Sequence, residues 1–167
     1  MNGCNTITAM LKSREHVQAA FDAIIESYSE RLYWHIRRIV VVHEDAEDIL
    51  QDTFVTAFTE SGRFRGDTES SLAAWLYKIA TSLGLRHLRR RKRNIFTSVD
   101  SLRGELAVDF EGETAPDADE TAKRLQRAVV ALPMKQKLVF NMRYYDEMSF
   151  DEISQVTGMS VSTLKTN

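Results

Sequence analysis

Five consecutive cations, Arg89 to Arg93, form the stretch of this sequence best suited to bind an anion. They end a helical pattern that also carries Arg86, and the helix dipole favours cations at that end. One or two charges suffice for a solvated helix end, whereas five repel one another unless an anion such as phosphate is bound. The run therefore predicts contact with nucleic acid, and a merely solvated helix end is the alternative.

Aromatic side chains precede this basic run, and such side chains suit stacking against unpaired bases. They are Phe64, in a predicted loop, and Trp75 and Tyr77, in the helix that ends in the basic run. Trp75 falls on the apolar face of that helix, so we expect it in the core. Tyr77 lies off that face, so we expect Tyr77 to be the better candidate for contacting DNA.

The segment 149–167 has the pattern of a helix-turn-helix, which places a short helix in the major groove of DNA. Ser149 and Glu152 can form a capping box at the start of a first helix. The apolar face of that helix comprises Phe150, Ile153 and Val156. Gly158 can end it in the left-handed conformation, and Ser160 can cap a second helix. Ordinary bundles also join short helices through a glycine turn, so this pattern alone leaves DNA binding and bundle packing open.

A further helical pattern begins with a cluster of acidic residues. The cluster comprises Glu44, Asp45, Glu47, Asp48 and Asp52. Acids near a helix N-terminus are stabilised by the helix dipole, which is one interpretation. The other is a docking face for a basic partner, with Leu50, Gln51 and Phe54 exposed beside the acids. The pattern by itself favours neither interpretation.

Helical periodicity runs through most of the chain, and no strand is convincing. The first predicted helices cover residues 21–39, 45–58 and 72–93, with a loop at 61–71. A second helical block starts near Thr121, and Pro133 is placed to open one of its helices. The sequence therefore predicts an all-α fold with two small helical domains, residues 1–93 and 121–167. The second domain contains the helix-turn-helix.

Residues 94–120 are expected to form a flexible acidic linker between these domains, because periodicity fades there. Residues 104–121 contain seven acids and no base, which gives a net charge of −7. Residues 1–103 carry a net charge of +2, and residues 122–167 carry +3. The formal net charge of −2 therefore conceals two near-neutral to basic blocks, so the charge of the whole chain is no argument against nucleic-acid binding.

Several classes of function lack their residues in this sequence. There is no phosphate-binding loop, nucleophile elbow or metal-ligand set, so we expect no enzymatic activity, cofactor, metal or small-molecule substrate. The single cysteine, Cys4, excludes an intrachain disulfide and is expected on a frayed terminus. No apolar run is long enough to span a membrane, and residues 1–11 lack the pattern of a signal peptide. We therefore expect no membrane insertion and a cytoplasmic location.

Taken together, residues 17–167 resemble the extracytoplasmic-function sigma factors of the main bacterial sigma family. Three segments carry the resemblance, in the family's order. Residues 45–58 read DAEDILQDTFVTAF and are similar to the region that grips the clamp coiled coil of RNA polymerase. Residues 75–93 read WLYKIATSLGLRHLRRRKR and resemble the helix that opens and reads the minus-ten promoter element. Residues 132–165 read LPMKQKLVFNMRYYDEMSFDEISQVTGMSVSTLK and resemble the region that reads the minus-thirty-five element.

The resemblance implies three sets of contact residues. The polymerase-binding set is Asp48, Leu50, Gln51, Asp52 and Phe54. The minus-ten set is Phe64, Arg65, Tyr77, Lys78, Ser82, Arg86, Arg89, Arg90, Arg91 and Arg93. The minus-thirty-five set is Ser162, Thr163, Lys165 and Thr166, with Val161 and Leu164 packed inward. The resemblance also assigns the loop at 61–71 to capturing a flipped non-template base. Ser82 stands where the family commonly has Asn, which implies a different promoter preference there.

The partners implied by the resemblance are core RNA polymerase, promoter DNA and an anti-sigma factor. Two alternatives are a sigma-like decoy that sequesters an anti-sigma protein and a simple helix-turn-helix repressor. The basic run from Arg89 to Arg93 argues against a decoy, and no dedicated dimerisation element supports a repressor. The family's recognition helix continues past the position of Asn167, so we expect this chain to bind duplex minus-thirty-five DNA weakly or not at all.

Overall fold

We describe the protein from a computed structural model, which covers residues 3–13, 16–95 and 120–166. Within these residues every regular element is a helix, which confirms the all-α prediction. The helices of the N-terminal block are α1 (Gly3–Lys12), α2 (Val17–Val40), α3 (His43–Glu60), the 3-10 turn η1 (Ser61–Arg63) and α4 (Glu69–Ile95). Those of the C-terminal block are α6 (Glu120–Ala131), α7 (Met134–Tyr144), α8 (Phe150–Thr157) and α9 (Val161–Thr166).

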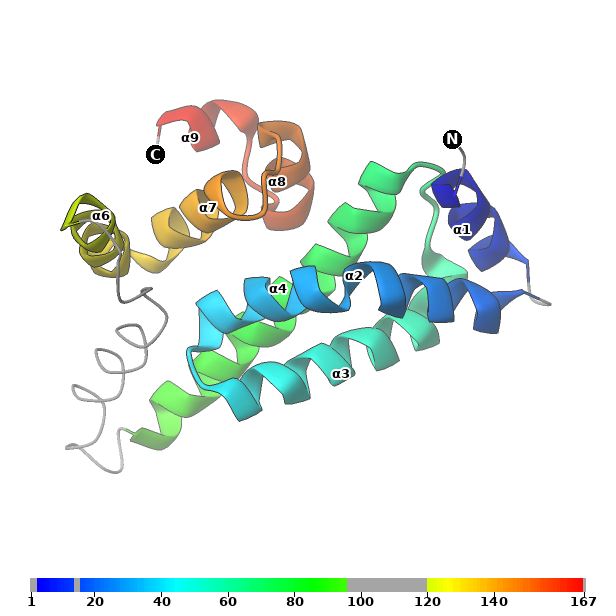
Figure 1. Cartoon of the computed structure of the whole chain (residues 1–167), viewed down its shortest axis with the longest axis horizontal. Coiled ribbons are helices and arrows are strands. Elements are labelled where there is room, and N and C mark those ends of the chain that lie inside the picture. The colour runs from blue at the N-terminus through cyan, green and yellow to red at the C-terminus, as the bar shows by residue number, and fades with distance from the viewer. Residues whose placement is uncertain (1–2, 14–15, 96–119, 167) are drawn as a thin grey trace.

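The N-terminal block is built around a bundle of α2, α3 and α4, which pack against one another in all three pairs (Figure 1). The buried stripe of α2 recurs every three or four residues and includes Tyr28, Leu32, His35, Ile36 and Ile39. Helix α3 buries the smaller side chains Ala46, Thr53 and Ala57 together with Ile49. A tight turn at Val41, with φ of 68°, joins α2 to α3, so Asp45 lies beside the C-terminal part of α4.

Helix α1 was not expected from the sequence, which predicted a frayed N-terminus. It packs against α2 and also contacts α4, and it buries Thr8 and Leu11. The Thr8 hydroxyl donates to the Asp67 carbonyl at 3.4 Å, which links α1 to the loop before α4. The apolar side chains Ile7, Met10 and Leu11 have helical spacing and pack against the core, a signal that the sequence analysis missed.

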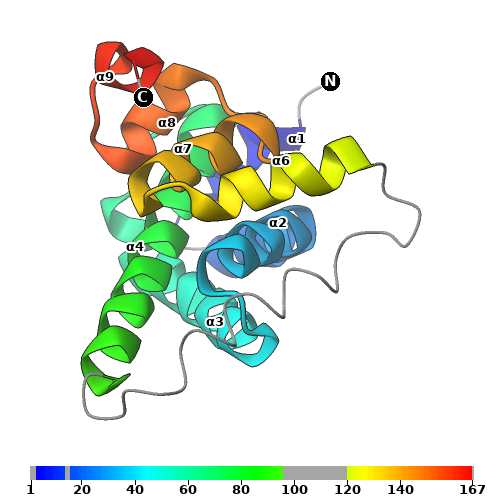
Figure 2. The same cartoon turned by 90° about the vertical axis from the view of Figure 1, so that its left-hand side faces the viewer.

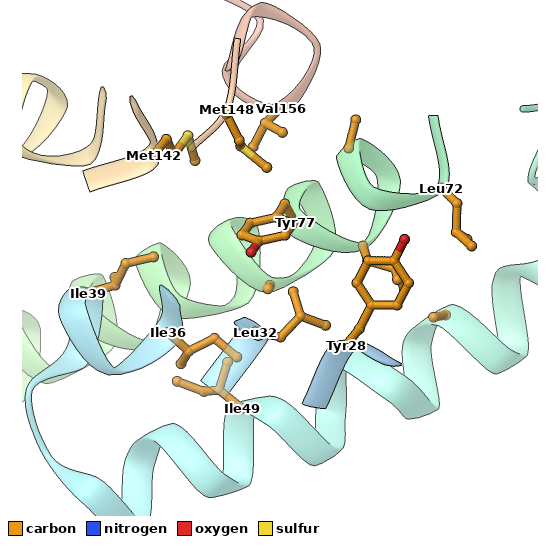
Figure 3. Packing of buried hydrophobic residues seen from close by; sticks show 14 of the residues in the cluster. Tyr28, Leu32, Ile36, Ile39, Ile49, Leu72, Tyr77, Met142, Met148 and Val156 are labelled. Carbon is orange, nitrogen blue, oxygen red and sulfur yellow. The ribbon is translucent and has the colours of Figure 1, made fainter. Parts of the chain in front are cut away.

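The C-terminal block lies across the bundle rather than apart from it. Helix α8 packs on α4, and α7 contacts α2 (Figures 1 and 2). Met142, Met148 and Val156 point from this block toward α4, and Tyr77 lies beneath them (Figure 3). These side chains belong to the same buried cluster as Leu32, so one apolar core runs through both blocks.

The ends of the predicted linker are helical, since α4 continues to Ile95 and α6 begins at Glu120. The rest of that linker, residues 96–119, lies outside the described residues. The division into domains 1–93 and 121–167 stays a prediction.

Candidate nucleic-acid interface

A pocket of about 250 Å³ lies where the loop before α4 meets the first turns of α4. Its apolar wall contains the rings of Phe64 and Trp75, whose centroids are 5.0 Å apart. The full lining is Arg63, Phe64, Arg65, Gly66, Ser71, Ala74, Trp75, Lys78 and Gln155. The three cations of this set are exposed. An aromatic wall with cations around it suits a nucleobase and the phosphates attached to it.

Local hydrogen bonds fix the loop that forms this pocket. Thr68 and Ser71 cap the start of α4 reciprocally, because each backbone N–H donates to the other's hydroxyl at 3.1–3.2 Å. A Cβ added to Gly66 would lie 2.6 Å from Cζ of Phe64, so the loop can pass this closely only with glycine. The packing leaves Phe64 only 6% exposed. Phe64 is therefore a wall of the pocket and not a freely exposed ring.

Trp75 and Tyr77 have the reverse of their predicted positions. The prediction that Tyr77 is exposed toward DNA is wrong, because its side chain is 1% exposed. Trp75, which was expected in the core, is half-buried and lines the pocket. The reason is that α8 covers the side of α4 that carries Tyr77 (Figure 3). The apolar pattern of α4 alone indicated one buried face, whereas the helix has neighbours on two.

A stripe of exposed polar side chains leads away from the pocket along α4. It contains Lys78, Ser82, Arg86, Arg89 and Arg90, all of which are exposed. Positions four residues apart lie on nearly the same side of a helix, so Lys78, Ser82 and Arg86 form a continuous row. We call these five residues the α4 stripe. Arg65, also predicted at this interface, is exposed at the pocket, and its guanidinium donates to the Gly62 carbonyl at 2.6 Å.

Arg91 belongs to a different contact. Its guanidinium donates to Oδ2 of Asp45 at 3.0 Å, and Nε2 of His87 lies 3.1 Å from the same oxygen. The side chain predicted to meet DNA is therefore engaged with the first turn of α3. The side chain of Arg93 lies outside the described part of the structure, although its backbone belongs to α4.

The predicted polymerase-binding residues all lie on α3, but they are not equally accessible. Asp48, Gln51 and Asp52 are exposed. Leu50 and Phe54 were expected to be exposed, whereas both are half-buried and pack against the core. Val55 and Phe58, which the sequence did not single out, are 64% and 47% exposed. The exposed side of α3 therefore combines acids, an amide and two apolar side chains.

The helix-turn-helix forms as the sequence predicted. The capping box of Ser149 and Glu152 is present, and Gly158 ends α8 with φ of 74°. The Ser149 backbone N–H holds the pKa of Glu152 below its usual value, while burial opposes this effect.

Ser160 caps α9 by accepting the backbone N–H of Thr163 at 3.2 Å. Of the predicted groove-facing residues, Ser162, Thr163, Lys165 and Thr166 are all exposed. Leu164 is buried and Val161 half-buried, as expected.

A polar cluster between the two blocks was missed by the sequence analysis. Nδ1 of His35 lies 2.7 Å from Oδ2 of Asp146, and Nε2 lies 2.8 Å from the Thr81 hydroxyl. The other carboxylate oxygen of Asp146 accepts from Arg38 at 3.2 Å. Burial raises the pKa of the adjacent Tyr77 to about 12, and the Asp146 carboxylate adds to the rise. The available signal was a polar residue, His35, in phase with the apolar stripe of α2.

Among the described residues, no group of three or more His, Cys, Asp or Glu side chains is placed to hold a metal ion. In the same part of the chain, no helix is long and apolar enough to cross a membrane.

Comparisons with known proteins match both blocks. The family model for Sigma-70 region 2 matches residues 24–94, and that for Sigma-70, region 4 matches residues 122–167. The chain is 30% identical over 165 residues to RNA polymerase sigma factor YlaC of Bacillus subtilis, covering 93% of this chain and 87% of the relative. It is 28% identical over 157 residues to ECF RNA polymerase sigma factor SigW of the same organism, covering 89% and 83%.

Solved structures share the fold. The sigma factor RpoE of Bartonella quintana, in complex with the anti-sigma factor NepR, aligns with a TM-score of 0.70 and 20% identity. That alignment covers 87% of this chain and 88% of the other. CnrH, in complex with the cytosolic domain of CnrY, aligns with a TM-score of 0.68 and 20% identity over 99% of this chain and 89% of the other. The chain therefore belongs to the sigma-70 family as an extracytoplasmic-function sigma factor, which binds core RNA polymerase and directs transcription initiation at promoters.

Proposed function

We propose that the two blocks divide the work of promoter recognition. The N-terminal block docks on polymerase through α3 and holds an unpaired base of the minus-ten element in the pocket before α4. The C-terminal block reads upstream duplex DNA through α9. The observation that carries this assignment is the pocket itself, because its aromatic wall stands at the head of the α4 stripe.

The pocket and the α4 stripe supply two complementary interactions. The Trp75 ring, half-buried against Phe64, offers a flat apolar surface on which a flipped base can stack. Lys78 lines the pocket and begins the α4 stripe, so the backbone phosphates of the same strand can follow the cations along α4. A bound unpaired strand favours the open duplex, because a ligand that prefers one state shifts the population toward it.

The docking surface consists of Asp48, Gln51 and Asp52 with the exposed apolar side chains Val55 and Phe58. An apolar centre beside polar and charged groups is typical of protein interfaces. The half-buried Leu50 and Phe54 support this surface from below, since both pack against the core. The ion pair between Arg91 and Asp45 holds the start of α3 against α4, so it positions the docking helix.

The C-terminal block contributes a polar helix surface to the major groove. In helix-turn-helix proteins the N-terminal residues of the second helix meet base edges. In α9 these are the hydroxyls of Ser162, Thr163 and Thr166 and the ammonium of Lys165. An anti-sigma factor is the further partner in this proposal, because the structural neighbour RpoE is a sigma factor in complex with the anti-sigma factor NepR. The protein acts in the cytoplasm in this proposal and has no enzymatic activity.

The decisive experiment is run-off transcription with core polymerase on a promoter library, followed by binding measurements on the selected minus-ten strand. Base stacking on an aromatic side chain contributes about 1–3 kcal/mol, so Trp75→Leu should weaken binding of the single-stranded oligonucleotide about tenfold or more. Trp75→Phe should retain most of the affinity because it keeps an aromatic face.

The matched control is Trp34→Leu, which removes the other tryptophan, 38% exposed on α2. Equal affinities of the Trp75→Leu and Trp34→Leu proteins would refute the pocket assignment. The absence of any promoter-specific transcript would instead support the alternative function, a sigma-like decoy that sequesters an anti-sigma protein.

A further inference from the structure

Helix α1 contacts the loop that forms the pocket on both sides of Phe64. It packs against η1, which precedes Phe64, and its Thr8 hydroxyl donates to the carbonyl of Asp67, which follows Phe64. It also contacts α4, whose first turns complete the pocket (Figure 1). The family model for Sigma-70 region 2 begins its match at residue 24, so α1 lies outside the matched segment. The family match therefore gives α1 no role.

The peptide group between Asp67 and Thr68 is held from two directions. Its carbonyl accepts from the Thr8 hydroxyl at 3.4 Å, and its N–H donates to the Ser71 hydroxyl at 3.1 Å. The contact with Ser71 is local to the start of α4, whereas the contact with Thr8 joins two segments 59 residues apart. A peptide group is planar, so holding both of its polar atoms fixes its orientation. The path of the chain on either side of the group depends on that orientation.

Gly66, the residue before Asp67, connects this peptide group to the aromatic wall of the pocket. An added Cβ at Gly66 would lie 2.6 Å from Cζ of Phe64, so the backbone lies directly against that ring. The Phe64 ring in turn packs on the Trp75 ring, with 5.0 Å between the centroids. Closely packed groups transmit a shift to their neighbours. Rotation of the 67–68 peptide would therefore disturb the surface on which a base stacks.

The residues of α1 that face the bundle are buried well enough to hold the loop. Thr8 and Leu11 are 2% and 4% exposed, and Ile7 and Met10 also pack against the core. Apolar burial docks α1 but is not directional, whereas a hydrogen bond depends on both distance and angle. The apolar side chains therefore attach α1 to the bundle, and the Thr8 hydroxyl specifies where α1 holds the loop.

We propose that α1 is a positioning element of the pocket and that Thr8 is its positioning residue. Helix α1 holds residues 61–68 in the conformation that presents the rings of Phe64 and Trp75 to an unpaired base. This inference rests on the proposed function of the pocket. Thr8 is not part of the pocket lining, so it acts on the base through the loop. Without its hydrogen bond the loop samples other conformations, and the apparent affinity falls with the fraction of molecules whose loop is in place.

The experiment compares single-site variants of the full chain. Thr8→Val removes the hydroxyl and keeps the shape of the side chain, and Thr8→Ser restores a hydroxyl. Thr53→Val is the matched control, because Thr53 is also buried and donates to a backbone carbonyl, that of Ile49, at 2.7 Å within α3. Trp75→Leu tests the pocket itself. Circular dichroism checks that each variant keeps its helices.

The probe is the single-stranded minus-ten oligonucleotide selected by run-off transcription, together with versions that carry one abasic site at each position in turn. Fluorescence anisotropy measures the affinity of each oligonucleotide. The ratio of the affinities for the intact and the abasic strand isolates the contribution of the captured base. Amide hydrogen exchange measures the order of residues 61–68.

In the unmodified protein, an abasic site at the captured base should lower the affinity about tenfold, because stacking of that base is lost. We expect Thr8→Val to weaken binding of the intact strand about fivefold, the usual effect of one net hydrogen bond, and to leave binding of the abasic strand unchanged. Amide exchange in residues 61–68 should become faster. Thr8→Ser should recover most of the affinity ratio, and Thr53→Val should retain it. A role in stability alone would lower both affinities equally, because both strands bind the same folded protein.

The outcomes separate this inference from the function on which it rests. If Trp75→Leu leaves the affinity ratio unchanged, the pocket holds no base, and both the pocket assignment and the positioning role of α1 are wrong. If Trp75→Leu abolishes the ratio but Thr8→Val behaves like Thr53→Val, the pocket assignment stands and the positioning role is overturned. Equal weakening of the intact and abasic strands by Thr8→Val, or no recovery in Thr8→Ser, would also overturn it.

Discussion

Each exposed cation of the α4 stripe should contribute one phosphate contact, and the salt dependence of DNA binding should report that contact. Arg89 and Arg90 are exposed near the end of α4, whereas Arg91 is engaged by Asp45. Changing both Arg89 and Arg90 to Gln should therefore remove two phosphate contacts without disturbing α3. Each contact with single-stranded DNA contributes about 0.7 to the slope of log affinity against log salt, so the slope should fall by about 1.4. Over a salt range of roughly 50 to 200 mM this amounts to about a sevenfold difference.

The assay is a salt titration of binding to the single-stranded minus-ten oligonucleotide by fluorescence anisotropy. The matched control changes Arg124 and Lys135 to Gln, which removes two exposed cations from the C-terminal block. The control should leave the slope unchanged. A slope equal to that of the unmodified protein in the Arg89 and Arg90 variant would show that these side chains form only a solvated helix end.

The single variant Arg91→Gln gives a second comparison within the basic run from Arg89 to Arg93. Because its guanidinium pairs with Asp45, the variant should change the salt slope less than Arg90→Gln does. Partly exposed ion pairs contribute at most about 1 kcal/mol, so the free energy of unfolding should fall only slightly. A larger change in slope for Arg91→Gln than for Arg90→Gln would contradict the pairing with Asp45.

Three further predictions concern α3 and the helix-turn-helix. Gln51→Ala with Asp52→Ala should weaken binding to core polymerase, by about 2 kcal/mol if either is a hot spot, in a pull-down or anisotropy assay. Gly158→Ala should lower the free energy of unfolding by about 1 kcal/mol in urea denaturation, because a Cβ at φ of 74° is strained although nothing lies within 4 Å of it. Glu152 has a lowered folded-state pKa, so its stabilisation is complete above the ordinary carboxyl pKa and is lost as the pH falls toward the lowered value. The Glu152→Gln protein should therefore lose less free energy of unfolding than the unmodified protein as the pH falls.

The first two of these predictions each have a control variant in the same chain. Gln18→Ala with Asp22→Ala makes the same two changes on exposed positions of α2 and should leave polymerase binding intact. Gly62→Ala should cost little, since an added Cβ meets nothing there and φ is not positive. Equal destabilisation by Gly62→Ala and Gly158→Ala would contradict the argument from backbone strain at Gly158. If Glu152→Gln leaves the pH dependence of the free energy of unfolding unchanged, the argument from the lowered pKa of Glu152 is wrong.

The sequence determined the features that depend on neighbours within about four residues. The capping box of Ser149 and Glu152, the left-handed Gly158 and the inward Leu164 all formed as predicted. Helical periodicity over residues 21–39 likewise predicted α2, whose buried stripe includes Tyr28 and Leu32. These signals are reliable because capping and helix phase are set by local backbone geometry.

Only the tertiary structure decided which side chains of α4 are accessible. The apolar pattern of a helix predicts its buried face when one neighbour covers it, but α4 packs against the bundle on one side and α8 on another. Tyr77 is therefore buried and Trp75 reaches the pocket. Likewise His35 and Asp146 are 111 residues apart, and no local pattern of either residue indicates the other. Their contact exists because burial of Met142 and Met148 brings α7 and α8 onto the bundle, and long-range packing of this kind leaves no periodic trace in the sequence.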